Sequence, residues 1–171
     1  MTDQTTPPAA APGPLAGLAL TVIVLLIIIA WVALGLQFLT DTSLFGGFLL
    51  LWFWANNEQL EIKRLPTAIV GALVGIGLAW FVVFAATKWG GAGLAAGLGL
   101  MVLALYLDVI KAVPFAINAS TMLFLTVAAA PLIQLKVNWQ ELVLSTVVGG
   151  LFFGLVVEAL KRLAARFAPA G

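Results

Sequence analysis

Long apolar stretches recur along this chain, and their length constrains its fold more than any other feature. Leu15 to Phe38, Thr67 to Ala86 and Leu142 to Leu160 each approach or exceed the roughly 20 residues that a helix needs to cross a bilayer. Hydrophobic residues make up 63% of the chain and charged residues 9%, which is too apolar for a soluble domain of this size. The alternating pattern of a transmembrane barrel is absent. The sequence therefore predicts an all-α polytopic membrane protein.

Three further stretches complete a predicted bundle of six helical segments. Ala92 to Leu107 is rich in glycine, and Pro114 to Ile133 is the most polar of the six. Leu44 to Ala55 has only 12 apolar residues before the polar run from Asn56 to Gln59, so this second segment is either a short crossing or re-entrant. A short, interrupted hydrophobic segment is the best sequence indication of a transport site in a membrane protein.

Domain organisation and orientation follow from the ends and the charges. Residues 1–14 carry four prolines and no base, which predicts a disordered tail before the transmembrane domain 15–160. Residues 161–171 form a basic end that we expect to lie along the membrane surface. An excess of Lys and Arg marks the cytoplasmic side. With five or six crossings, six of these residues lie on the side of the C-terminus and two on the other side. This predicts a cytoplasmic C-terminus and leaves the side of the N-terminus open. The six are Lys63, Arg64, Lys111, Lys161, Arg162 and Arg166, and the two are Lys88 and Lys136.

Several classes of function are disfavoured by the residues present. The chain has no cysteine and no histidine, which removes thiolate and histidine chemistry and most transition-metal sites. It has no phosphate-binding glycine loop with lysine and no credible catalytic set, so we expect no enzyme, no metal and no cofactor. A net charge of +1 gives no reason to expect a nucleic-acid partner.

The two halves of the chain share an order of features that suggests a three-plus-three inverted repeat. In the first half Phe53 to Asn56 precedes Gly71 and Gly75, and in the second Phe115 to Asn118 precedes Gly150 and Gly154. Inverted repeats place a transport site near the membrane midplane, where two broken segments meet. The alternative is that helices rich in Leu, Gly and Phe resemble one another without a repeat.

Amides beside aromatic rings are the first candidates for a solute site. Asn56 and Asn57 offer hydrogen-bond donors and acceptors to a polar solute, and Trp52 and Trp54 would form a narrow constriction. The alternative is a polar helix end at the cytoplasmic headgroups with tryptophan anchors. In the second half, Asn118, Ser120 and Thr121 follow Pro114 and would line the pathway, with Phe115 in the constriction. The alternative is that Ser120 and Thr121 bond back to their own helix.

Charged and small residues supply two further candidate sets. Asp108 and Lys111 lie at helical spacing and form either a coupling pair for a proton or ion, or a pair that reaches water at a span end. Three pairs of glycines at GxxxG spacing let helix backbones approach closely, within one bundle or between chains: Gly71 and Gly75, Gly93 and Gly97, and Gly150 and Gly154.

The order of several motifs carries a family resemblance. These are the entry Ser43 to Phe48 into the short aromatic segment, Asn138-Trp139, Ser145, Gly150 and Phe153-Gly154. From about Trp31 to Arg166 the chain resembles the YcdZ-like inner-membrane proteins of bacteria, a family of unknown function. The resemblance implies a bacterial inner-membrane location. Asn56-Asn57 departs from the Cys/Pro/Gly-type turn expected there. A weaker similarity links the chain to one membrane half of the aromatic-acid exporters, without their soluble domain.

Two functions remain for such a chain. We expect a small channel or transporter that moves a small polar solute or ion across the lipid bilayer, and its size suggests a homo-oligomer. The alternative is a non-transporting membrane subunit that binds a partner protein through glycine-lined helix faces. A polar, hydrated path through the chain favours the first, and exposed GxxxG faces favour the second.

Overall fold

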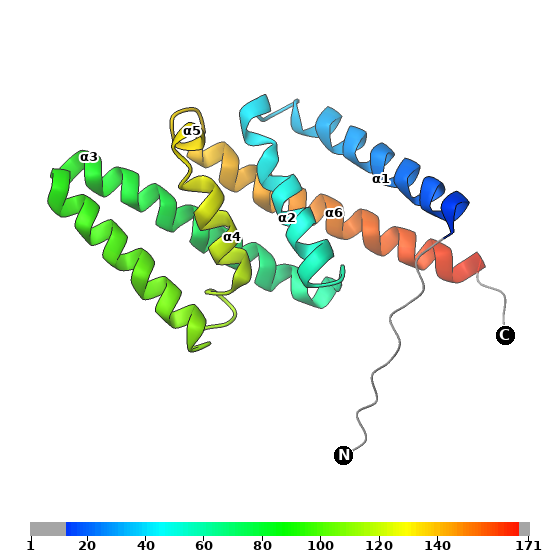
Figure 1. The fold of residues 1–171 in the computed structure, drawn as a ribbon. Helices are drawn as coiled ribbons and strands as arrows, with labels where there is room; N and C mark the ends of the chain where they lie inside the picture. Colours follow the sequence, from blue (N-terminus) through cyan, green and yellow to red (C-terminus); the bar gives the residue numbers. More distant parts are fainter. Residues whose placement is uncertain (1–12, 168–171) are drawn as a thin grey trace, which may run out of the picture.

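The computed structural model describes residues 13–167, and every regular element in that range is helical (Figure 1). Three stretches of helix are long and apolar enough to cross a membrane: residues 17–35, 62–109 and 139–166. The all-helical fold with six helices confirms the predicted fold class. The helices are α1 (Pro14–Gly35), α2 (Phe45–Asn57), α3 (Leu65–Val109), α4 (Ala119–Ala128), α5 (Pro131–Gln134) and α6 (Trp139–Phe167), with short 3-10 turns at Asp41–Ser43 and Ile62–Arg64.

The ends of the chain differ in detail from the expected domain boundaries. Residues 1–12 lie outside the described residues, and with them most of the expected disordered tail; Pro14 already belongs to the first turn of α1. The last helix continues past Leu160 to Phe167, so the basic end begins as part of α6.

Helix α3 is a hairpin of two predicted segments joined at one glycine. Gly90 has φ 60° and ψ −136°, a conformation that side-chain-bearing residues rarely adopt, and it separates the arms 65–89 and 91–109 (Figure 1). The arms pack so closely that a Cβ at Gly93 would collide with the Ala85 carbonyl of the first arm.

Helices α2 and α4 are much shorter than a bilayer is thick. Helix α2 has 13 residues and α4 has 10, so their lengths are about 20 Å and 15 Å against a hydrocarbon core of about 30 Å. Helix α2 runs from one end of the bundle to the other without turning back, so the second segment is a short traverse and not a re-entrant loop (Figure 1).

The predicted start of the fifth segment at Pro114 is wrong. Residues 110–118 form turns and bends, and α4 begins at Ala119. The reason is local: the Asn118 side chain accepts hydrogen bonds from the first turn of α4 and so fixes where the helix starts. A second break at Ala130 separates α4 from α5, where Pro131 opens a new turn.

Each short helix packs in the same direction along a long one. Helix α2 follows α6: Gly46 lies against Leu142 and Thr146, and at the far end the Leu60 carbonyl accepts a hydrogen bond of 2.6 Å from Lys161. Helix α4 packs on the first arm of α3, with Asn118 against Gly71 and Leu125 against Gly75. An apolar core fills the space between these pairs, with Leu50, Phe53, Ile76 and Phe124 among its members.

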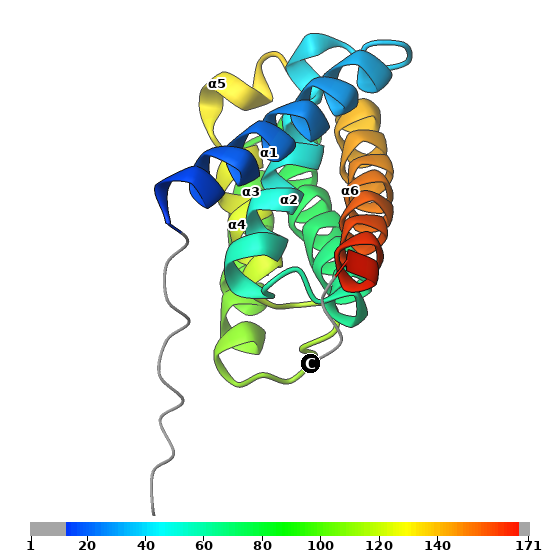
Figure 2. The same cartoon turned by 90° about the vertical axis from the view of Figure 1, so that its right-hand side faces the viewer.

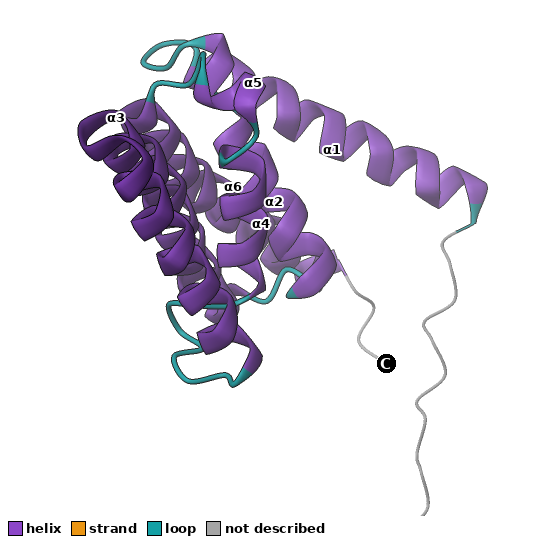
Figure 3. Ribbon diagram, turned by 60° about the vertical axis from the view of Figure 1, so that its left-hand side comes forward, coloured by secondary structure: helices purple, strands orange, loops and turns teal. Residues whose placement is uncertain are grey.

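The outer surface of the bundle is apolar, as a bilayer requires. Helix α1 lies on the outside (Figure 2), and only 6% of its apolar window is buried. The loops gather at the two ends of the bundle (Figure 3). One end holds residues 58–61 and 110–118, and at the other the Thr40 backbone N–H donates to Glu141 over 2.8 Å.

Candidate functional site

Buried hydroxyl groups are concentrated at two helix contacts. Among the described residues, the buried polar side chains are Ser43, Ser120, Thr121, Ser145 and Thr146. We call the first contact, made by Asn118, Ser120 and Thr121 of α4 with Gly71 and Gly75 of α3, the α3–α4 seam. The second, made by Gly46 and Gly47 of α2 with Ser145, Thr146 and Gly149 of α6, is the α2–α6 seam. The α3–α4 seam joins three residues predicted to bind solute with two glycines predicted to pack helices.

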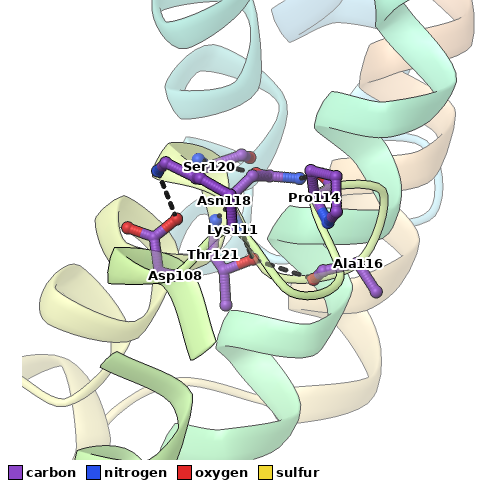
Figure 4. A network of polar contacts seen from close by, with 7 residues as sticks. All are labelled: Asp108, Lys111, Pro114, Ala116, Asn118, Ser120 and Thr121. Atoms are coloured by element: carbon purple, nitrogen blue, oxygen red, sulfur yellow. Dashed lines mark hydrogen bonds and ion pairs between the residues drawn. The ribbon is translucent and has the colours of Figure 1, made fainter. Parts of the chain in front are cut away.

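At the α3–α4 seam, Asn118 and Thr121 form a reciprocal cap on α4 (Figure 4). The Asn118 side-chain oxygen accepts from the backbone N–H of Ser120 at 2.9 Å and of Thr121 at 3.4 Å. The Thr121 hydroxyl accepts from the Asn118 N–H at 3.1 Å and donates to the Ala116 carbonyl at 3.0 Å. These bonds satisfy amides that a helix start otherwise leaves unpaired.

The same seam is tied to α3 through backbone carbonyls. The Ser120 hydroxyl donates to the Ala68 carbonyl over 2.8 Å, and the Asn118 amide donates to the carbonyls of Pro114 at 3.1 Å and Thr67 at 3.4 Å. Ser120 is fully buried. If these hydroxyl and amide groups release their carbonyl partners, they become unpaired polar groups inside the protein, which is costly. A solute or water molecule must therefore take the place of the carbonyl.

At the α2–α6 seam, an unpaired amide at the start of α2 is satisfied by a side chain from another helix. Gly47 lies in the first turn of α2, where N–H groups lack partners within the helix. Its N–H donates to the Ser145 hydroxyl over 3.1 Å, and Ser145 donates to the Leu44 carbonyl over 3.3 Å. Thr146 bonds back to the Leu142 carbonyl of its own helix at 2.8 Å.

Trp31 inserts from α1 into the glycine-lined part of this seam. Its ring lies so close to Gly47 and Gly149 that a Cβ at either would come within 3.2 Å of it, and it packs on Phe152 and Phe153 at centroid distances of 5.7 and 5.6 Å. Trp31 is fully buried, and within residues 13–167 its indole nitrogen has no hydrogen-bond partner. This contact anchors an otherwise exposed helix.

The other predicted amides and tryptophans lie apart from both seams. Asn56 and Asn57 end α2, and their amides donate to the Trp52 carbonyl at 2.8 Å and the Phe53 carbonyl at 3.3 Å. Trp52 is 56% exposed, whereas Trp54 is buried and donates to the Glu61 carbonyl at 2.8 Å. The two rings therefore do not face a common constriction.

Phe115 and the charged pair lie at the edge of the α3–α4 seam. Phe115 is 57% exposed, so it closes no path within this chain. Lys111 and Asp108 form an ion pair of 3.0 Å at the end of α3, close to the seam (Figure 4). Residues 13–167 hold no group of three His, Cys, Asp or Glu side chains that would bind a metal ion.

The glycines of the three GxxxG pairs all lie at contacts within the chain. A Cβ at any of them would come within 3.0 Å of a neighbouring segment: Gly71 and Gly75 face Asn118 and α4, Gly93 and Gly97 face the first arm of α3, and Gly150 and Gly154 face Leu50 and Leu65. These faces are therefore occupied inside one bundle.

The α2–α6 seam is the part of the site that sequence reasoning missed. Ser145-Thr146 is the only polar pair inside the predicted last segment, and Gly46-Gly47 opens the second, so both signals were readable. What the sequence lacked was the pairing of segments that lie about 100 residues apart.

Comparisons with protein-family models, with curated proteins and with solved structures give no match for this chain. The resemblance to the YcdZ-like proteins stays a prediction.

Proposed function

We propose that this chain is an integral membrane protein that moves a small polar solute or ion across the bilayer. The observation that carries the proposal is the pair of short helices, α2 and α4, each second in its half of the chain. Short or broken helices in corresponding positions of two halves are the best structural pointer to a transport site.

The packing pattern supports a three-plus-three inverted repeat. The second helix of each half packs along the third helix of the other: α2 on α6, and α4 on the first arm of α3. The sequence marks chosen for the repeat are not equivalent, however. Asn56 ends its helix and Asn118 precedes one, so the match between them is wrong even though the helix order agrees.

The two seams would serve as alternating gates. Ser120, Thr121 and Asn118 offer hydroxyl and amide groups toward one end of the bundle, and Ser145 and Thr146 toward the other. Apolar side chains between them, among them Phe53 and Phe124, hold the described conformation closed. Opening one seam would let a solute replace the carbonyl partners of the hydroxyl groups.

Orientation and location belong to the same proposal. The loops with Lys63, Arg64 and Lys111 and the C-terminal part of α6 lie at one end of the bundle, which we assign to the cytoplasm. A bacterial inner membrane and a homo-oligomer remain part of this proposal. The alternative, a partner-binding subunit, needs free GxxxG faces, and those glycines are covered within the chain.

Solute flux into proteoliposomes tests the proposal. Purified protein should speed the entry of at least one small neutral solute or ion above the rate in empty liposomes. Ser120→Cys then adds a near-isosteric thiol at a buried seam position in a chain without cysteine. A membrane-impermeant thiol reagent should label it and reduce the flux.

Thr126→Cys is the matched control, because Thr126 lies on the same helix but is exposed on its outer surface. Its thiol would face lipid, and we expect no labelling by a charged reagent. Equal rates with and without protein, together with an unlabelled Ser120→Cys, would show that no aqueous path exists and would remove the transport proposal.

A further inference from the structure

A polar pocket opens at the end of α2, beside the C-terminal part of α6. Its volume is about 340 Å³, and it is lined by Asn57, Glu58, Gln59, Glu61, Arg64 and Lys161. The loop that forms it is held in place: the Leu60 N–H donates to the Trp54 carbonyl at 3.1 Å, and its carbonyl accepts from Lys161. Gln59 and Leu60 both have positive φ, 49° and 56°, a strained backbone that tends to mark functional sites.

Acidic and basic side chains both line this pocket, and they are not fully paired with one another. The Arg64 Nε lies 3.9 Å from a Glu58 carboxylate oxygen and 3.8 Å from one of Glu61, beyond hydrogen-bond distance. No hydrogen bond within residues 13–167 involves the terminal guanidinium nitrogens of Arg64, and Lys161 uses one of its three donors. The pocket thus offers carboxylates to a cation and free N–H donors to an anion.

An apolar pocket of about 170 Å³ is lined in part by residues close in sequence to those of the polar pocket. Leu60 lines it, together with pairs of side chains from three helices: Val24 and Ile27 of α1, Leu51 and Ala55 of α2, and Phe153 and Val157 of α6. Ala55 lies two residues before Asn57, Leu60 follows Gln59, and Val157 is one turn before Lys161. Helix α2, the loop 58–61 and α6 therefore each contribute to both pockets, whereas α1 contributes to the apolar pocket alone.

We propose that the two pockets bind one phospholipid with a zwitterionic, primary-ammonium headgroup, namely phosphatidylethanolamine. Its phosphate would pair with Arg64 and Lys161, and its ammonium with Glu58 and Glu61. One acyl chain would fill the groove between α1, α2 and α6. A choline headgroup has no N–H to donate to the carboxylates, and a glycerol headgroup has no positive charge. The proposal rests on placement of the bundle in a bilayer, and not on solute transport.

Native mass spectrometry of the delipidated protein tests this site. The protein is titrated with phosphatidylethanolamine, phosphatidylcholine and phosphatidylglycerol of identical acyl chains. The ethanolamine lipid should bind most tightly. Glu61→Gln should weaken its binding about tenfold, since a charge-assisted hydrogen bond is lost, and leave phosphatidylglycerol binding unchanged or stronger. Glu158→Gln is the control, because Glu158 pairs with Arg162 and lines neither pocket.

A second variant tests the acyl groove separately. Ala55→Phe should fill the apolar pocket and lower lipid binding, whereas Ala33→Phe, on the exposed face of α1, should not. Free phosphoethanolamine serves as the headgroup without chains. The proposal is overturned if the three lipids bind equally, or if Glu61→Gln has no effect. It is also overturned if free phosphoethanolamine binds as tightly as the lipid, since the occupant would then be a soluble zwitterion. Solute flux into liposomes that contain no phosphatidylethanolamine tests the transport proposal independently of this site.

Discussion

Asn118 and Asn56 carry the same side chain at the same end of the bundle, but their partners give them different roles. Asn118 caps α4 and reaches the Thr67 carbonyl on α3, so it links two helices. Asn56 bonds only to the Trp52 carbonyl of its own helix. The spacing Asn118-Ala119-Ser120-Thr121 resembles a capping box, with Thr in place of the usual Glu or Gln, and that signal would have placed the helix start correctly.

Replacing each asparagine by alanine should separate these roles. We expect Asn118→Ala to lower the free energy of unfolding by about 1 kcal/mol or more, because the helix cap and the contact with α3 are lost together. Asn56→Ala should change it by less than about 0.5 kcal/mol. Unfolding monitored by circular dichroism in detergent provides the comparison. Equal losses for the two variants would contradict the assignment of the cap.

Gly75 and Gly77 lie two residues apart on α3 and form a second matched pair. A Cβ at Gly75 would collide with the Thr121 carbonyl and lie 2.8 Å from the Leu125 nitrogen, both backbone atoms of α4 that cannot move aside cheaply. Nothing lies within 4 Å of a Cβ at Gly77. Gly75→Ala should therefore lower the unfolding temperature, whereas Gly77→Ala should raise it slightly, because alanine favours helix by about 1 kcal/mol. Similar shifts for both would show that α3 and α4 are less tightly packed than described.

At the scale of elements, segment length was predictable and segment pairing was not. The runs of apolar residues predicted the order of the helices and the shortness of α2. The nearly uniform apolarity of α1 gave no sign of which face meets the bundle, so the burial of Trp31 was missed. The contacts of α2 with α6 join distant segments, and local patterns carry no information about such pairing.

The hairpin of α3 depends on the conformation of one residue. Gly90→Ala would put a side chain at φ 60°, which costs about 1–3 kcal/mol. Gly91→Ala is the control, because Gly91 has a helical conformation and no atoms near its Cβ position. Differential scanning fluorimetry should show a lower unfolding temperature for Gly90→Ala alone. An unchanged unfolding temperature would mean that the two arms tolerate another turn.

At the scale of the whole molecule, the first described helix begins and the last one ends at the same end of the bundle. Pro14 and Phe167 each lie at the end of a helix that runs to or from the opposite end of the bundle (Figure 1). The sequence left the side of the N-terminus open. Under the proposed orientation we expect it on the side of the C-terminus, because α2 runs once through the bundle.

Reporter fusions check this orientation. We expect a fluorescent protein fused to either end of the chain to fluoresce in the cytoplasm of a bacterial host. A phosphatase fused within the turn at Gly90 should instead be active outside. Activity of a phosphatase fused at the N-terminus would mean that the chain crosses the membrane an odd number of times.

Helix α2 of the first half packs on α6 of the second half, and this pairing also has a consequence for biosynthesis. About eighty residues separate the two helices, so at typical elongation rates α2 waits on the order of ten seconds for its partner to be synthesised. During that interval it is too short to cross the bilayer alone, and Gly47 lacks the hydroxyl of Ser145. We therefore expect the first half to stay incompletely packed until α6 has been synthesised, and a chain truncated before α6 to be degraded faster than the full chain.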